Sequence, residues 1–123
     1  MPKRKAEPVK LPSPDRQRAE LTAKFFRGLG DPTRLKIIEL LVERPMTVSE
    51  IVAALKQPQG RVSSHLACLR WCGFVSGQPE GRHVHYRVTD VRVRQLIGLA
   101  RSMLADHAAN LQACTRIDDT GKP

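Results

Sequence analysis

The chain has 123 residues, of which 41% are hydrophobic but only 4% aromatic, so we expect one domain with a modest aliphatic core between packed helices. Its 21 Lys and Arg residues against 12 Asp and Glu give a formal net charge of +9, which is typical of proteins that bind nucleic acid but can also serve solubility alone. No stretch approaches the length of a membrane span and the N-terminal segment has no apolar signal core, so we expect a cytoplasmic protein with no membrane partner.

Two terminal segments are poorly suited to a folded core. Residues 1–14 contain four of the nine prolines, and four Lys or Arg residues against one Glu. This composition predicts a disordered basic tail, which could contact DNA weakly. The last residues, 117–123, should fray. The folded domain is therefore predicted to span residues 15–116, which still carry an excess of positive charge.

Two helices are predicted at the start of this domain. From Asp15 to Leu29 the apolar spacing is helical, and Gly28 and Gly30 should end the helix. The next helix covers residues 35–42 and follows the segment Asp31-Pro32-Thr33-Arg34. In that segment the aspartate is a typical N-cap and the proline suits the first helical position.

A helix-turn-helix is predicted next. Thr47-Val48-Ser49-Glu50 is a capping-box sequence that opens a short helix with one apolar face. After a brief turn a second helix starts at Gln59, and the spacing of Val62, Leu66 and Leu69 predicts its buried side. The second helix of such a pair enters the DNA major groove. Its basic N-terminal half supplies the expected groove contacts: Gln59, Arg61, Ser63, Ser64 and His65.

A β-hairpin is predicted after the second helix. Its strands are Phe74–Gln78 and His83–Val88, and its turn is Pro79-Glu80-Gly81-Arg82. In the second strand Val84, Tyr86 and Val88 alternate with a basic face. A basic hairpin beside the reading helix is what a DNA-binding wing needs, and we interpret its histidines as exposed strand residues rather than metal ligands. The wing residues expected to touch phosphate or the minor groove are Arg82, His83 and His85.

The last helical segment runs from Asp90 to about Leu111. Its apolar stripe is wide, and no later element is predicted to cover it. Burial against a second copy, together with the first helix, is the simplest way to remove this stripe from water. We therefore expect a homodimer.

Cys68 and Cys72 form a candidate metal site in the second half of the reading helix. At a spacing of i, i+4 their thiolates lie on one helix face and can chelate a soft metal ion. They share a stripe with Arg61 and His65, about a quarter turn from the buried stripe. Three cysteines in a reducing compartment argue against a disulfide framework, and leave metal binding, redox chemistry and simple packing as alternatives.

The order of these elements resembles the ArsR/SmtB family of metal-responsive repressors, over roughly residues 19–111. The segments that carry the resemblance are LGDPTRLKIIELL, VSSHLACLRWCGFV and EGRHVHYRVTD. The resemblance implies a mainly α fold with a β-hairpin, that is, a dimeric winged helix-turn-helix. It also implies a homodimeric repressor that occupies double-stranded operator DNA until an inducer binds.

Within that family, HLACLRWCG followed by a cysteine in the terminal segment is similar to the cadmium- and lead-sensing CmtR type. This similarity implies Cys68, Cys72 and Cys114 as ligands, either within one chain or across the dimer. Three thiolates favour Cd(II) or Pb(II), and also Hg(II), over harder ions. The ligand patterns of other family members are missing: the helix after Thr47 has no Cys-x-Cys, and Arg92 stands where a zinc-binding histidine would be. No organic cofactor is expected.

Three other functions are compatible with parts of the sequence. One is a winged-helix repressor switched by a disulfide of Cys72 or Cys114, and another is a constitutive repressor without a sensor. The third, a small thiol enzyme, belongs to a different class. We expect no enzyme, because the sequence has no nucleophile–base constellation and no phosphate-binding glycine loop.

Overall fold

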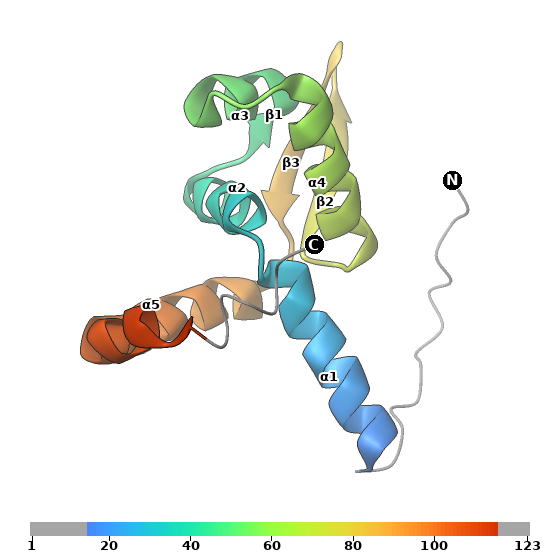
Figure 1. Ribbon diagram of the computed structural model, residues 1–123. Coiled ribbons are helices and arrows are strands. Elements are labelled where there is room, and N and C mark those ends of the chain that lie inside the picture. Colours follow the sequence, from blue (N-terminus) through green and yellow to red (C-terminus); the bar gives the residue numbers. More distant parts are fainter. Residues whose placement is uncertain (1–14, 116–123) are drawn as a thin grey trace.

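Side chains from the helices and a small sheet meet in one apolar core in the computed structural model, which describes residues 15–115. Figure 1 shows how these helices and strands are arranged. The predicted tails, 1–14 and 117–123, lie outside the described residues. The fold class expected from the sequence, mainly α with a β-hairpin, is confirmed. In chain order the elements are α1 Arg16–Leu29, α2 Pro32–Glu43, β1 Met46–Thr47, α3 Val48–Leu55, α4 Gln59–Trp71, β2 Val75–Glu80, β3 His83–Val88 and α5 Val91–Ala113.

Side-chain caps explain where four of the helices begin. The carboxylates of Asp15, Asp31 and Asp90 accept hydrogen bonds from backbone N–H groups in the first turns of α1, α2 and α5. At the start of α3 the capping box is complete, because Glu50 N–H donates to the Thr47 hydroxyl (3.2 Å) and Thr47 N–H donates to the Glu50 carboxylate (2.9 Å). The predicted starts at Asp31 and Thr47 are therefore confirmed.

The buried stripe of α4 is the centre of the core. Val62 and Leu69 are fully buried and Leu66 is 2% exposed, as their spacing predicted. Their neighbours in the core come from α2, α3, the start of β2 and the first turns of α5. The largest fully buried side chains of those elements are Ile37, Ile38 and Ile51. Because this packing fixes the rotation of α4, the opposite side of the helix has to face solvent.

The sheet has one strand more than predicted. β3 lies between β1 and β2, and both pairings are antiparallel. The extra strand β1 pairs Met46 with Tyr86 and Thr47 with His85. A two-residue strand is too short to show an alternating pattern, so its pairing depends on β3 and cannot be recognised locally.

The hairpin turn is tighter than predicted. Pro79 and Glu80, which the sequence placed in the turn, continue β2 and pair with Val84 and His83. Only residues 81–82 remain in the loop, where Gly81 has a positive φ of 66°. The proline is tolerated because β2 is an edge strand, whose outer side needs no backbone donor.

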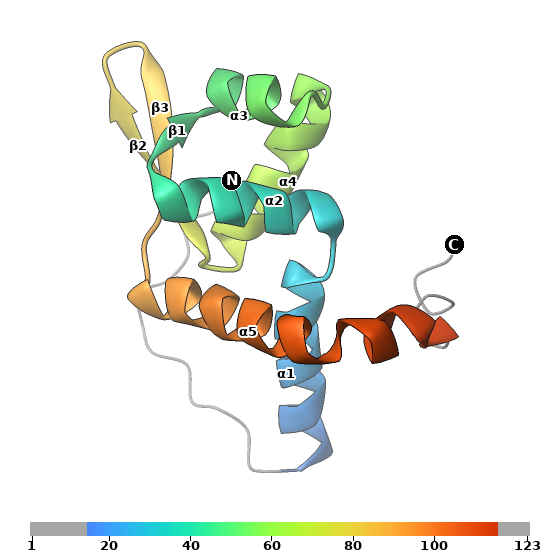
Figure 2. The ribbon, with the colours of Figure 1, turned by 90° about the vertical axis from the view of Figure 1, so that its left-hand side faces the viewer.

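Helices α1 and α5 project from this body in different directions (Figures 1 and 2). An ion pair of Arg101 with Glu39 (3.3 Å) and a hydrogen bond from Arg94 to the Val42 carbonyl hold α5 against α2. Large apolar side chains of both helices remain exposed, among them Phe26 (54%) and Leu99 (60%). Within residues 15–115 no helix combines the length and apolarity needed to cross a bilayer.

Replacing Thr47 with alanine should lower the free energy of unfolding by about 1 kcal/mol, because the Glu50 N–H loses its partner at the start of α3. Denaturant titration measures the loss as a lower midpoint at unchanged slope. Ser49→Ala is the matched control, since Ser49 is exposed in the same turn but lies outside the capping box. Equal stability of the Thr47→Ala protein and the wild type would contradict the assigned role of this cap.

Candidate functional site

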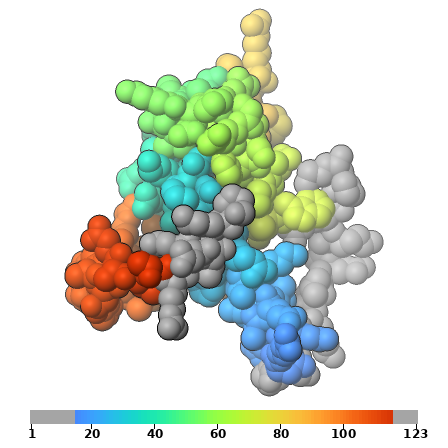
Figure 3. Space-filling view, in the orientation of Figure 1, coloured from blue at the N-terminus to red at the C-terminus, as the bar shows by residue number. Residues whose placement is uncertain are grey.

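The exposed N-terminal half of α4 and the tip of the β-hairpin lie at the same end of the molecule, away from the projecting α1 (Figure 3). The helix follows α3 after a short turn, which is the helix-turn-helix arrangement. Four of the five residues that the sequence assigned to groove contacts are exposed here, namely Gln59, Arg61, Ser63 and Ser64. These four side chains therefore reach solvent from the first half of α4.

The start of α4 differs from the starts of the other helices. Its N-cap is Pro58, and no side chain of the described part of the chain caps it, whereas α1, α2, α3 and α5 all have side-chain caps. The first N–H groups of a helix have no partner inside the helix. Those of α4 can therefore take an acceptor from outside, and a phosphate oxygen suits them because the helix dipole is positive at this end.

The wing is less basic than its sequence indicates. Arg82 and His83 are exposed at the tip, but the side chain of His85 is only 29% exposed. The carboxylate of Glu80, which lies on the same face of the hairpin, is 3.2 Å from His85 Nδ1 and 3.5 Å from an Arg87 Nη. Glu80, which the sequence placed in the turn, thus pairs with Arg87 and lies beside His85 on this face.

His65 faces the interior side of α4 rather than the exposed surface. Its side chain is 19% exposed, with Nδ1 3.3 Å from Arg34 Nη1 and Nε2 3.8 Å from an Asp31 oxygen. Burial alone would raise the pKa of Asp31, but hydrogen bonds from the backbone N–H groups of Arg34 and Thr33 and the charge of the Arg34 guanidinium outweigh burial, so the pKa is lowered overall. In the sequence Asp31 and Arg34 are recognisable only as part of a helix start, because contacts between distant segments have no local signal.

The three cysteines occupy two separate places. Cys68 and Cys72 are one turn apart at the end of α4, where the Cys72 N–H donates to the Cys68 carbonyl at 3.0 Å. Cys114 is the C-cap of α5. Within residues 15–115, no three His, Cys, Asp or Glu side chains of one chain are placed to share a metal ion. Cys68 and Cys72 are therefore neighbours on one helix, and no such group of three in the described residues joins them to Cys114 within one chain.

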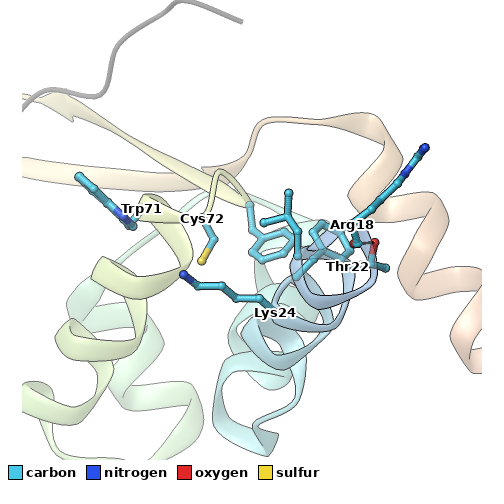
Figure 4. Close-up of a pocket in the computed structure, with 8 residues that line it drawn as sticks. Arg18, Thr22, Lys24, Trp71 and Cys72 are labelled. Atoms are coloured by element: carbon cyan, nitrogen blue, oxygen red, sulfur yellow. Dashed lines mark hydrogen bonds between the residues drawn. The ribbon is translucent and has the colours of Figure 1, made fainter. Parts of the chain in front are cut away.

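Each thiol region borders a hollow on the surface. Cys72 opens into a cavity of about 500 Å³ between α1 and the end of α4, with the aromatic rings of Phe25 and Phe74 in its wall and Lys24 extending across it (Figure 4). Cys114 lies in an apolar groove of about 660 Å³ along α5, which also includes His107. Both hollows therefore belong to the faces of α1 and α5 that the body leaves exposed.

Comparison with known proteins places this geometry in a family. Residues 31–76 match the family model described as "Bacterial regulatory protein, arsR family". The chain is 46% identical over 103 residues to a probable mercury resistance operon repressor of Streptomyces lividans, covering 84% of this chain and 82% of the relative. It is 36% identical over 81 residues to the HTH-type transcriptional regulator CmtR of Mycobacterium tuberculosis, covering 66% of this chain and 69% of that one.

Solved structures agree with this assignment. The crystal structure of Rv0081 from Mycobacterium tuberculosis matches with a TM-score of 0.72 and 31% identity, over 77% of this chain and 96% of that one. A homodimeric winged helix-turn-helix DNA-binding domain from Mycobacterium bovis, a possible ArsR-family regulator, matches with a TM-score of 0.66 and 28% identity, over 78% and 90% of the two chains. With its helix-turn-helix, its wing and these relatives, the chain belongs to the ArsR family of DNA-binding transcriptional regulators.

Proposed function

We propose that the protein is a homodimeric repressor that leaves its operator when its thiolates bind a soft metal ion, Cd(II), Pb(II) or Hg(II). The observation that carries the proposal is that exposed polar side chains and a pair of thiols occupy successive halves of one helix. Arg61 and Ser64 are exposed in its first half, and Cys68 and Cys72 follow about one to three turns later. The similarity to a probable mercury resistance operon repressor supports a metal as the inducer.

DNA binding is assigned to the exposed half of α4 and to the wing tip. The helix enters the major groove with its uncapped end against a phosphate, and the hairpin touches the flanking backbone or minor groove. The side chains available for these contacts are Gln59, Arg61, Ser63, Ser64, Arg82 and His83. His65 and His85, which the sequence also assigned to DNA, are partly buried and already have protein partners, so their share of the contacts is smaller.

A second copy is the proposed cover for the exposed faces of α1 and α5. Phe25, Phe26, Met103 and Leu104 are each about half exposed, and a monomer rarely leaves so many large apolar side chains in water. A two-fold dimer would bury both faces in one self-complementary interface. It would also place two reading helices about one DNA turn apart, as an imperfect palindrome requires.

The metal site is proposed to form across this dimer. Cys68 and Cys72 of one protomer supply two thiolates, and Cys114 of its partner supplies the third. The proposal rests on the position of Cys114 in the exposed groove of α5, because that groove belongs to the face expected to meet the second copy. Three thiolates make a soft donor set that prefers Cd(II), Pb(II) or Hg(II) to Mg(II) or Ca(II).

Metal binding at this site would then change how the dimer fits its DNA. Closing the thiolate site would tie the end of α5 of one protomer to the end of α4 in its partner, and so would change the angle or spacing of the two reading helices. A coupling free energy of about 1–3 kcal/mol is enough to weaken DNA binding about 5- to 150-fold.

Glu80→Gln should tighten binding to a duplex that the wild-type protein has selected from random sequence, by about 2- to 10-fold at ~0.1 M salt. The substitution removes the carboxylate that holds His85 and Arg87, so both become available to phosphates. Fluorescence anisotropy across a salt series should also show a steeper salt dependence. Glu20→Gln makes the same change of charge on α1, where Glu20 pairs with Arg16, and should leave the affinity nearly unchanged. Weaker binding by Glu80→Gln would show that Glu80 orders the wing instead of restraining it.

Mixed dimers test the proposed metal site. A Cys114→Ser chain keeps both α4 thiols, and a Cys68→Ser/Cys72→Ser chain keeps only Cys114. Neither variant alone should give the ultraviolet sulfur-to-cadmium charge transfer of a three-thiolate site. After exchange of subunits between the two variants, each mixed dimer contains one complete site across its interface, so the absorption and tight Cd(II) binding should return. A mixture that stays as weak as its components would rule out the shared site.

A further inference from the structure

The guanidinium of Arg34 joins three elements at the point where α1 ends and α2 begins. Its Nε donates to the Gly28 carbonyl at 2.7 Å, and one Nη donates to the Arg27 carbonyl at 3.1 Å. The other Nη lies 3.3 Å from Nδ1 of His65 on α4. The planar fork of arginine can make these contacts at once, whereas the single ammonium of a lysine cannot. This side chain therefore fastens the end of α1 to the reading helix.

The imidazole of His65 fits this contact in one tautomer. A neutral imidazole has one N–H donor and one bare acceptor nitrogen. With the hydrogen on Nε2, the bare Nδ1 accepts from Arg34 while Nε2–H faces Asp31, the N-cap of α2, at 3.8 Å. The contact joins residues 31 positions apart in the sequence and is partly buried, so it is shielded from competing water.

His65 lies between the two functional halves of α4. Ser64 precedes it on the exposed DNA-facing surface, and Cys68 follows it by about one turn. The other end of the contact is also close to a thiol, because a Cβ placed on Gly28 would lie 3.7 Å from Cys72 Sγ. The end of α1 thus lies close to Cys72 and is also fastened through Arg34 to His65, which follows the exposed Ser64.

We propose that Arg34 and His65 form a latch that positions α4 relative to α1 and transmits metal binding to the DNA. This inference rests on the proposed function above, and it assigns to His65 a positioning role instead of a base contact. In the latched state α4 moves only together with α1, whose exposed face is the proposed dimer surface. A shift at the thiols therefore alters the separation of the two reading helices. Without the latch, a displacement of α4 caused by metal binding is not passed on to α1. The separation of the two reading helices then stays the same.

His65→Asn and His65→Leu are a matched pair of similar size for this test. The side-chain oxygen of asparagine can take the position of Nδ1 and accept from Arg34, whereas leucine offers no acceptor. Both variants leave the Arg34 contacts to the Arg27 and Gly28 carbonyls in place, so the end of α1 keeps its cap. The measured quantity is the ratio of dissociation constants for the selected duplex with and without saturating Cd(II). Thermal unfolding and the Cd(II) affinity of the DNA-free protein are recorded for each variant.

The latch predicts that His65→Leu reduces this ratio by about 2- to 30-fold, while His65→Asn keeps it within about twofold of the wild type. The Cd(II) affinity should remain the same in both variants, because His65 is not a metal ligand in this account. A merely structural role would lower the unfolding temperature but leave the ratio unchanged.

Three results would overturn the latch: a wild-type ratio in His65→Leu, an equal loss in both variants, or a loss of Cd(II) affinity. If the wild-type protein binds the duplex equally well with and without Cd(II), the ratio is one and the proposed metal-dependent release is wrong. The latch would then have no effect of metal binding to transmit. The failure of the latch and the failure of the proposed function are therefore distinguishable in one set of titrations.

Discussion

The rotation of α4 about its own axis is the constraint on which the rest of the structure depends. Val62, Leu66 and Leu69 anchor one side of this helix in the core, and exposing any of them would cost about 1.5–3 kcal/mol. The same packing turns Arg61 toward solvent, and the helical spacing of Cys68 and Cys72 places them one turn apart at the end of α4. Arg61 and the two thiols lie on the same helix, so a displacement of α4 as a whole moves both ends of it.

Net charge alone gives an incomplete picture of the DNA-facing surface. The chain carries +9, but several of its basic side chains are directed to partners inside the protein. The Arg34 guanidinium contacts the Gly28 carbonyl and His65, and the Arg87 guanidinium forms an ion pair with Glu80 on the wing. What remains for a phosphate is a smaller set at the start of α4 and at the wing tip. The contacts of Arg34 and Arg87 thus reduce the positive charge available to DNA, and they also fix the position of α4 and of the wing.

Features governed by local chemistry could be predicted from the sequence. The caps at Asp31 and Thr47 and the buried stripe of α4 are determined by residues within a few positions of each other. Features that depend on distant segments were missed or misplaced: the β1 strand, the end of β2, and the Glu80 and Arg34 contacts. The spacing of Cys68 and Cys72 was predictable, since it lies within one helix. The place of Cys114 was not, because it depends on the direction of α5 and on the proposed second copy.

If α4 couples a thiolate site to a DNA-binding surface, thermodynamic linkage makes this coupling measurable from the metal side as well as from the DNA side. Cd(II) is titrated into the DNA-free wild-type protein and into the protein saturated with its selected duplex, and the two metal affinities are compared. Coupling requires that DNA weaken Cd(II) binding by the same factor, about 5- to 150-fold, by which Cd(II) weakens DNA binding. Equal Cd(II) affinities in the two titrations would contradict it, because the thiolate site would then bind metal without acting as the switch.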